Sequence, residues 1–179
     1  ILDFNMYGGL YREVNFIEKN NIYISNPSIA DIEAGGGVFI TFPTVNEKMS
    51  EVKIQTHVIN EGENDKGARI KHVIKKGNDI VEEVTADIIL RKGKQGNTWC
   101  YTVEMDSPAL WSPDSPTLYT LETTIYDEDG MVMDRNTERF GIRKFEFKDN
   151  QLYINGKKTY LRGVNRHQEY PYIGYALSD

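Results

Sequence analysis

The chain has 179 residues, of which 39% are hydrophobic and 27% charged, with a formal net charge of −6. This balance is typical of a globular chain with a buried core. The acidic excess argues against nucleic acid as a partner, because binding a polyanion needs basic stripes. No apolar run approaches the ~20 residues of a membrane-spanning helix, so we expect no membrane partner. The single cysteine, Cys100, excludes an internal disulfide and leaves the redox compartment open.

The two ends of the sequence suggest that it belongs to a longer protein. It begins at Ile1, without methionine and without the basic and apolar segments of a signal peptide. It stops at Asp179, shortly after a polar motif. We therefore expect a piece of a larger chain, and these residues say nothing about its cellular location.

Residues 1–20 contain a single apolar run, Val14 to Ile17, behind the turn at Gly8-Gly9. One strand is too little for a domain. We expect either a lone leading strand or the last piece of a neighbouring domain. The polar residues 18–21 then predict a linker.

Residues 21–144 show the pattern of a β-sandwich, in which short alternating strands are separated by turn residues. Val52 and Ile54 alternate with Lys53 and Gln55, and the same period of two recurs from Trp99 to Met105 and from Tyr119 to Ile125. Further strands are expected near residues 37–42, 68–74, 84–90 and 131–133. No segment shows a convincing helical period. About seven strands in ~120 residues fit an immunoglobulin-like sandwich.

Two conspicuous motifs in this region have structural interpretations. Gly35-Gly36-Gly37 resembles a phosphate loop only superficially, because no Lys-Ser/Thr and no helix follow it. We expect a turn before the next strand. Trp111 lies among three prolines between Pro108 and Pro116, where no regular ladder can form. Sugar stacking by its indole is conceivable, but we expect it to anchor the crossing loop on the core.

The histidines of the sandwich do not predict a metal site, because no cysteine or carboxylate stands beside them at ligand spacing. His57 has the parity of Lys53 and Gln55, which predicts a solvated side chain. His72 has the parity of Ile70 and Ile74, which predicts a hydrogen-bonded core or edge histidine. We expect no metal ligands in this chain.

The last segment predicts a hairpin that runs into a polar cluster. Residues 152–154 and 159–161 flank Asn155-Gly156, a pair that tolerates the positive φ angles of a type I′ turn. The cluster that follows contains Arg162, Asn165, Arg166 and His167. Polar residues at the carboxyl end of a strand are how (β/α)8 barrels build active sites. The chain ends before a helix can follow, so most of such a barrel would lie outside it.

Three separated stretches of the sequence resemble glycoside hydrolase family 2, the β-galactosidase and β-glucuronidase family. They occur in the family's order: Tyr7–Val14 (YGGLYREV), Pro108–Leu121 (PALWSPDSPTLYTL) followed by Phe140–Arg143 (FGIR), and Asn155–His167 (NGKKTYLRGVNRH). Residues 26–96 add little to the resemblance.

The resemblance implies an all-β fragment with three parts. Residues 1–20 would be the tail of an N-terminal sugar-binding jelly-roll domain, and residues 21–144 an immunoglobulin-like β-sandwich. Residues 145–179 would be a β-hairpin and the first strand of a truncated (β/α)8 (TIM) barrel. Contacts to the missing flanking domains are implied as well.

The resemblance also implies the roles of the polar cluster. His167 would line the pocket of the sugar being cleaved, with Arg162 and Asn165 supporting that pocket as substrate-binding residues. Gln168 departs from the glutamate frequent at this position in the family, so neither it nor Glu169 is assigned an acid/base role. We expect Arg166 to be either a surface charge or a residue behind those that contact the sugar.

The family's two catalytic carboxylates come from later barrel strands, so this chain should contain none and be inactive. The parent would be a retaining β-glycosidase, most simply a β-galactosidase, that hydrolyses carbohydrate. It would be cytoplasmic, periplasmic or secreted in a bacterium, with a requirement for Mg or Na unknown and no cofactor in this part. The chain would act as a structural spacer. The alternative is a self-contained carbohydrate-binding or protein-interaction module, which needs an exposed aromatic platform.

Overall fold

The computed structural model describes residues 8–165 and 170–176. Residues 19–159 form one compact unit, and the described parts of residues 1–18 and 160–179 form a second. Among the described residues, no helix is long and apolar enough to cross a membrane.

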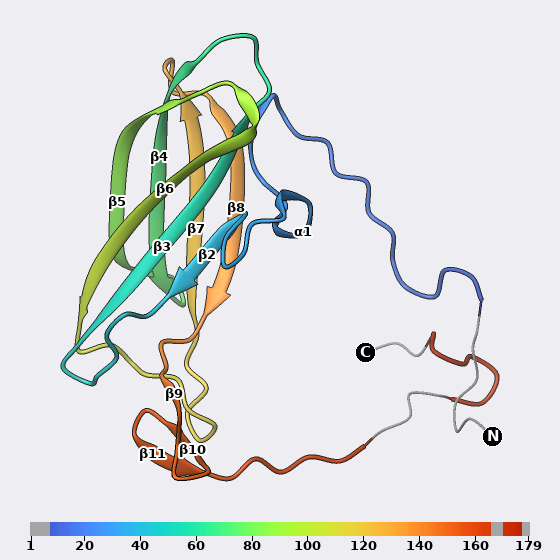
Figure 1. Cartoon of the computed structure of the whole chain (residues 1–179), viewed down its shortest axis with the longest axis vertical. Coiled ribbons are helices and arrows are strands. Elements are labelled where there is room, and N and C mark those ends of the chain that lie inside the picture. The colour runs from blue at the N-terminus through green and yellow to red at the C-terminus, as the bar shows by residue number, and fades with distance from the viewer. Residues whose placement is uncertain (1–7, 166–169, 177–179) are drawn as a thin grey trace. The chain divides into compact units, whose positions relative to one another are not determined.

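The larger unit is a sandwich of two antiparallel sheets, as the alternating sequence predicts (Figure 1). One sheet has β3 (Met49–Asn60) at its centre; β6 (Gly93–Asp106) pairs with one of its edges, and β1 (Ile22–Ile24) and β2 (Val38–Thr41) pair with the other. The second sheet has the order β5 (Asp79–Leu90), β4 (Lys66–Lys76), β7 (Tyr119–Asp127) and β8 (Val132–Phe140). The expected fold class, an all-β sandwich, is confirmed.

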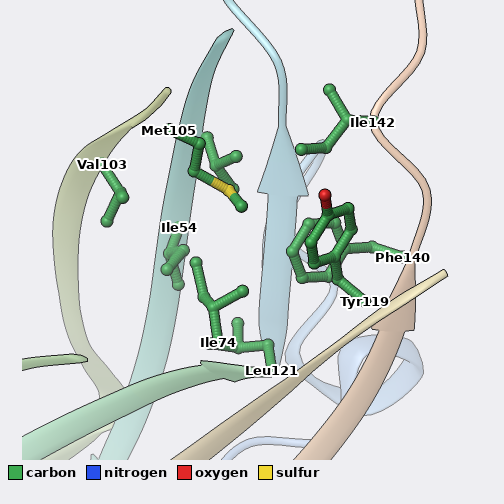
Figure 2. Close-up of a cluster of buried hydrophobic side chains, with 9 residues drawn as sticks. Ile54, Ile74, Val103, Met105, Tyr119, Leu121, Phe140 and Ile142 are labelled. Atoms are coloured by element: carbon green, nitrogen blue, oxygen red, sulfur yellow. The ribbon is translucent and has the colours of Figure 1, made fainter. Parts of the chain in front are cut away.

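The core lies between the sheets, where inward side chains form two apolar clusters. The first cluster, shown in Figure 2, contains Val52, Ile54, Ile74, Val103, Met105, Tyr119, Leu121, Phe140 and Ile142. The second contains Ile22, Ile24, Val58, Ala68, Ile70, Leu90 and Ile125. Both follow from the period of two, because alternate residues of each strand face the partner sheet.

The outer face of β3 is covered at one end, which corrects the prediction for His57. Its side chain is only 2% exposed, although its parity places it with Lys53, which is exposed, and Gln55, which is half-buried. The segment between β1 and β2, through Ser25, and the irregular part of β6 at Gly96 lie against the imidazole at this end. A Cβ on Gly96 would lie 2.4 Å from His57 Nε2. Local coverage of the strand overrides its alternation.

That covering segment contains the one short helix of the described residues, α1 (Pro27–Ala30), which the sequence analysis did not predict. The side chain of Asn26 accepts hydrogen bonds from the amides of Ser28 and Ile29, and Pro27 occupies the first turn. An Asn cap followed by proline is a recognised start signal. A single turn is too short to show a period. The glycine run that follows forms the turn before β2, as predicted.

A third, three-stranded sheet follows the sandwich in the same unit. It consists of β9 (Phe145–Lys148), β10 (Gln151–Ile154) and β11 (Lys157–Thr159). The turn residues Asn155 and Gly156 have φ angles of 51° and 77°, so the predicted hairpin is confirmed. Its second strand ends at Thr159, two residues earlier than expected, and Tyr160 and Leu161 are exposed.

The strand expected at residues 14–17 does not form. Val14 and Phe16 are 72% and 94% exposed, and no ladder pairs this run with another strand among the described residues. Without a pairing partner, the backbone of an exposed run bonds to water instead of forming a ladder. A lone leading strand is therefore not formed, and the alternative, the last piece of a neighbouring domain, stays a prediction.

Candidate functional site

The turn residue Asn155 joins the hairpin to the sandwich through three hydrogen bonds. Its side-chain Nδ2 donates to the carbonyl oxygen of Trp111 at 2.9 Å. Its Oδ1 accepts from the amide of Lys144 at 2.9 Å, and its own amide donates to the Lys144 carbonyl at 2.9 Å. Asparagine suits this place because it tolerates a positive φ and offers both a donor and an acceptor.

Trp111 and Arg143 form the other half of this contact. The Trp111 amide donates to the Ile142 carbonyl at 2.9 Å, and the Arg143 guanidinium lies 4.8 Å from the centre of the indole ring and 5.4 Å from that of Phe145. A Cβ on Gly141 would lie 2.8 Å from Trp111. The predicted role of Trp111 as a loop anchor agrees with these contacts, although its ring is half-buried at the edge of the core.

We call the set Trp111, Gly141, Arg143, Lys144 and Asn155 the junction. It connects the proline-rich loop, the end of β8 and the hairpin turn through backbone and side-chain bonds at once. Arginine stacked between two aromatic rings adds cation–π attraction to these bonds. The hairpin is therefore held in one orientation on the sandwich up to the end of β11.

The predicted substrate-binding residues lie beyond this point. Arg162 and Asn165 are exposed and belong to no strand in the smaller unit, and His167 lies outside the described residues. The structure therefore does not assemble a pocket from them. Within the same unit, Arg12 Nη1 donates to the carbonyl of Tyr175 at 2.9 Å, and the rings of Tyr11 and Tyr175 are 5.7 Å apart. Sequence reasoning did not anticipate this contact between the two end motifs.

The adjacent acidic residues of the sandwich have structural partners. Glu83 forms an ion pair with Lys71 at 2.8 Å. Asp127 accepts hydrogen bonds from the amides of Asp129 and Met131, which closes the β7–β8 turn. Neither arrangement resembles two carboxylates facing across a bond to be cleaved. The described residues contain no group of three or more His, Cys, Asp or Glu side chains that fits a metal ion.

His57 lies in a buried chain of hydrogen bonds. Its Nε2 is 2.8 Å from the carbonyl oxygen of Gln95, and its Nδ1 is 2.8 Å from Ser25 Oγ. A carbonyl only accepts, so Nε2 carries the proton, and in the neutral ring Nδ1 accepts from the Ser25 hydroxyl. Ser25 Oγ in turn accepts from the Gly37 amide at 2.8 Å. These hydrogen bonds connect the end of β1 and the start of β2 to β3 and β6. The Gly37 amide is thus bonded to Ser25 and is not free to bind a phosphate.

His72 is buried, as predicted, and its Nδ1 lies 2.9 Å from Thr123 Oγ1. Its ring stacks on Trp99 at 5.4 Å. Burial lowers the pKa of His72 from 6.5 to about 4, because the charged form loses its hydration. The imidazole is therefore neutral at pH 7 and serves the core rather than proton transfer to a substrate.

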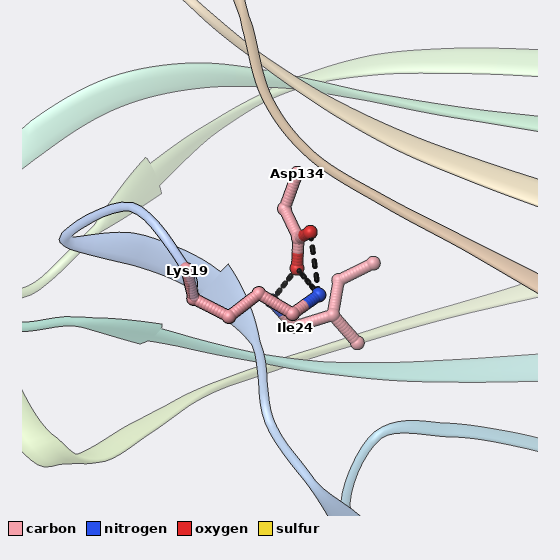
Figure 3. Close-up of polar contacts among 3 residues, drawn as sticks. All are labelled: Lys19, Ile24 and Asp134. Atoms are coloured by element: carbon pink, nitrogen blue, oxygen red, sulfur yellow. Dashed lines mark hydrogen bonds and ion pairs between the residues drawn. The ribbon is translucent and has the colours of Figure 1, made fainter. Parts of the chain in front are cut away.

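Asp134 is the buried carboxylate of the sandwich. It accepts from the Ile24 amide at 2.8 Å and from Lys19 Nζ at 2.6 and 2.9 Å, as Figure 3 shows. Lys19 comes from the predicted polar linker and Ile24 from β1, so the carboxylate ties both to β8. A charged residue at an inward position of β8 is the sequence signal that identifies such a group.

Comparison with known families decides the identity. The model of glycosyl hydrolases family 2 matches residues 31–143, which is more than half of the chain. The TIM barrel domain of the same family matches residues 145–179. The chain belongs to glycosyl hydrolase family 2.

The family 2 relatives include β-galactosidases and β-glucuronidases. A β-galactosidase of Thermoanaerobacter pseudethanolicus is 31% identical over 100% of this chain and 22% of its own length. A β-galactosidase of Thermoanaerobacterium thermosulfurigenes is 29% identical over 98% of this chain and 23% of its own length. The chain thus spans about a fifth of these relatives.

Solved family 2 structures share the fold. β-Glucuronidase 2 of Bacteroides uniformis, covalently bound to cyclophellitol-6-carboxylate aziridine, has a TM-score of 0.75 at 28% identity, covering 98% of this chain and 21% of that one. The β-glucuronidase of Parabacteroides merdae has a TM-score of 0.76 at 27% identity, covering 99% of this chain and 20% of that one.

The two family 2 matches meet at the junction. The first ends at Arg143 and the second begins at Phe145, while Asn155 reaches back across this boundary to Trp111. The junction therefore lies at the boundary between the two matched segments.

Proposed function

We propose that this chain is the non-catalytic middle part of a retaining family 2 β-glycosidase and that it acts there as a structural spacer. The observation that carries this proposal is the junction. Three hydrogen bonds from one turn residue and a guanidinium stacked between two rings fix the start of the barrel region on the sandwich. A spacer needs such a contact, because catalysis depends on placing groups to within a fraction of an ångström.

We propose a β-galactoside as the substrate of the full-length protein. The support is the relationship to β-galactosidases along essentially the whole chain, at 31% and 29% identity. The solved neighbours at 28% and 27% identity are β-glucuronidases, which makes a β-glucuronide the competing substrate. A glucuronide carries a carboxylate that a galactoside lacks, so the activities toward the two substrates can be measured separately.

In this proposal the chemistry lies outside the described sandwich. A retaining enzyme places two carboxyl groups about 5–5.5 Å apart, one as proton donor and one as nucleophile. Both would come from barrel strands beyond Asp179. Arg162, Asn165 and His167 would contribute to the sugar pocket once the barrel is complete, with His167 donating or accepting a hydrogen bond at a sugar hydroxyl.

The test uses the full-length protein that contains this chain, with nitrophenyl β-D-galactoside and nitrophenyl β-D-glucuronide as substrates. We expect a higher kcat/KM for the galactoside. We also expect Asn155→Ala to lower kcat/KM about tenfold or more, since small displacements of a site cost this much. Asn150→Ala is the matched control, because Asn150 has a similar φ of 57° but lies in the exposed β9–β10 turn.

The outcomes separate the parts of the proposal. A preference for the glucuronide would replace the substrate and leave the spacer role intact. Equal activity of the Asn155 and Asn150 variants would remove the spacer role. A full-length protein that cleaves neither glycoside would contradict the proposed activity, and the carbohydrate-binding module would take its place.

A further inference from the structure

A polar layer crosses the interior of the sandwich between the two apolar clusters. It consists of Thr56 on β3, His72 on β4, Thr123 on β7 and Asn136 on β8. On β3, β4 and β7, the layer residue has one inward-facing neighbour on each side along its strand. One of these neighbours belongs to the first apolar cluster and the other to the second. The layer is thus at the same height in both sheets.

The register of the strands brings these residues together. His72 pairs with Thr123, and Thr123 pairs with Asn136, along the second sheet. On the first sheet Thr56 pairs with Trp99, whose ring stacks on His72 at 5.4 Å across the sandwich. Since cross-strand partners lie about 5 Å apart on one face, His72, Thr123 and Asn136 are neighbours within the second sheet. The contact between Trp99 and His72 joins them to the first sheet.

Three side-chain atoms of this layer are buried without a hydrogen-bond partner among the described residues: Thr56 Oγ1, His72 Nε2 and Asn136 Oδ1. Thr56 and His72 are at most 1% exposed, so bulk solvent does not reach them. Buried polar atoms nearly always have a partner, because leaving one unpaired is costly. All three such atoms lie in one layer, which indicates a shared partner rather than three separate defects.

We propose that the sandwich binds internal water in this layer, with at least one water molecule bridging His72 Nε2 and Thr56 Oγ1 and the layer of water continuing to Asn136 Oδ1. A water both donates and accepts, so it satisfies a ring nitrogen, a hydroxyl and an amide oxygen alike. It also has the two to four polar partners that a buried water needs.

The chemistry of the layer favours water over an ion. Its members are two hydroxyls, an amide and an imidazole that burial keeps neutral, with a pKa lowered to about 4. None of these four residues carries a compensating charge, and an uncompensated ion between the sheets would be strongly disfavoured. The bridging water links β3 to β4 and is independent of what the full-length protein hydrolyses.

The test is the nuclear Overhauser contact between water and the imidazole protons of His72 in the 179-residue chain. In the wild type and in Thr56→Ser, which keeps the hydroxyl, we expect a cross-peak whose sign is that of a long-lived bound water. We expect its loss in Thr56→Val, which has the same shape without the hydroxyl. Thr123 is unchanged in both variants, so a signal relayed through its hydroxyl would persist in Thr56→Val.

Absence of the cross-peak in the wild type, or its persistence in Thr56→Val, would overturn the proposal. If the valine variant does not fold, a crystal structure of the wild-type chain decides. An ordered water within about 2.7–3.2 Å of both His72 Nε2 and Thr56 Oγ1 supports the bridge. A protein atom bonded directly to His72 Nε2 refutes it.

Discussion

A single buried polar residue, Asp134, stabilises the edge of the sandwich at β1. Asp134 satisfies the amide of Ile24, which lies on the short strand β1, and neutralises its own charge through Lys19. The carboxylate is 8% exposed and the lysine 36%. The two contacts differ in kind, because the amide is buried while the lysine reaches water.

We predict that Asp134→Ala lowers the free energy of unfolding by about 3 kcal/mol, because it leaves the Ile24 amide unpaired in the interior. Lys19→Met should cost only about 1 kcal/mol, since the ammonium is partly solvated. Chemical denaturation measures both, and hydrogen exchange at Ile24 reports the local loss. A lysine variant as damaging as the aspartate variant would mean that the ion pair, not the amide, anchors β1.

His72 should make the fold sensitive to acid. Its pKa is 6.5 in the unfolded chain and about 4 in the folded one, so the unfolded state binds the proton first as pH falls. The contribution of His72 to stability is therefore constant above about pH 6.5 and declines between pH 6.5 and about 4, by about 3 kcal/mol in total.

We predict that His72→Asn, which keeps a hydrogen-bonding group near the position of Nδ1 without titrating, flattens this decline. The measurement is the urea midpoint at a series of pH values for both proteins. Identical pH profiles would show that His72 is not the titrating group.

At the scale of elements, the β10–β11 hairpin shows how one turn residue serves two purposes. Asn155 supplies the positive φ of the turn and at the same time bonds Trp111 and Lys144. Asn150, in the preceding turn, has a similar φ of 57° but no side-chain hydrogen bond to the described residues.

Comparing Asn150 with Asn155 separates the effect of the positive φ angle from the effect of the side-chain hydrogen bonds. We predict that Asn150→Ala costs about 1 kcal/mol, the price of a left-handed alanine. Asn155→Ala should cost about 1–2 kcal/mol more, because two side-chain hydrogen bonds are lost as well. Thermal or urea unfolding measures the difference, and faster exchange of the Lys144 amide should accompany the Asn155 change alone. Equal costs would reduce Asn155 to a turn former.

The elements were predictable where local pattern and tertiary structure agree. Alternation located the long strands, and Asn-Gly located the hairpin, because both signals are local. The prediction of a strand at residues 14–17 failed because an apolar composition does not by itself supply a strand to pair with. The prediction for His57 was wrong because the parity rule assumes an open outer face, whereas Ser25, Gln95 and Gly96 lie against the imidazole.

The candidate site was less predictable than the fold. The resemblance drew attention to Arg162, Asn165 and His167. The first two are exposed and belong to no strand, and His167 lies outside the described residues. The junction is formed by residues far apart in sequence, 111, 143 and 155, and no spacing rule connects them. Trp111 was identified as an anchor from its prolines, but its partners were visible only in the structure.

For the whole molecule, the spacer role predicts weak sugar binding. The outer face of β5, β4 and β7 has an open groove of about 700 Å³ in which Tyr126 is the aromatic residue. Two residues that line it, Arg69 and Asp87, already pair with each other at 2.7 Å. We expect the 179-residue chain to bind galactose or glucuronate with a Kd weaker than about 1 mM and to hydrolyse no nitrophenyl glycoside.

Isothermal titration and a colorimetric assay check this, with Tyr126→Ala as the control for the groove. Micromolar affinity that disappears in Tyr126→Ala would favour the binding-module alternative over the spacer.

The junction also decides where this protein can be cut or recombined. The family boundary at residue 144 is the obvious place to truncate the sandwich for expression or to exchange it between homologues. A cut there would remove Asn155, expose the Trp111 carbonyl and strip one aromatic ring from Arg143. The compact unit runs on to Thr159. A chimera that takes its crossover after Thr159 keeps the hairpin with the sandwich that orients it.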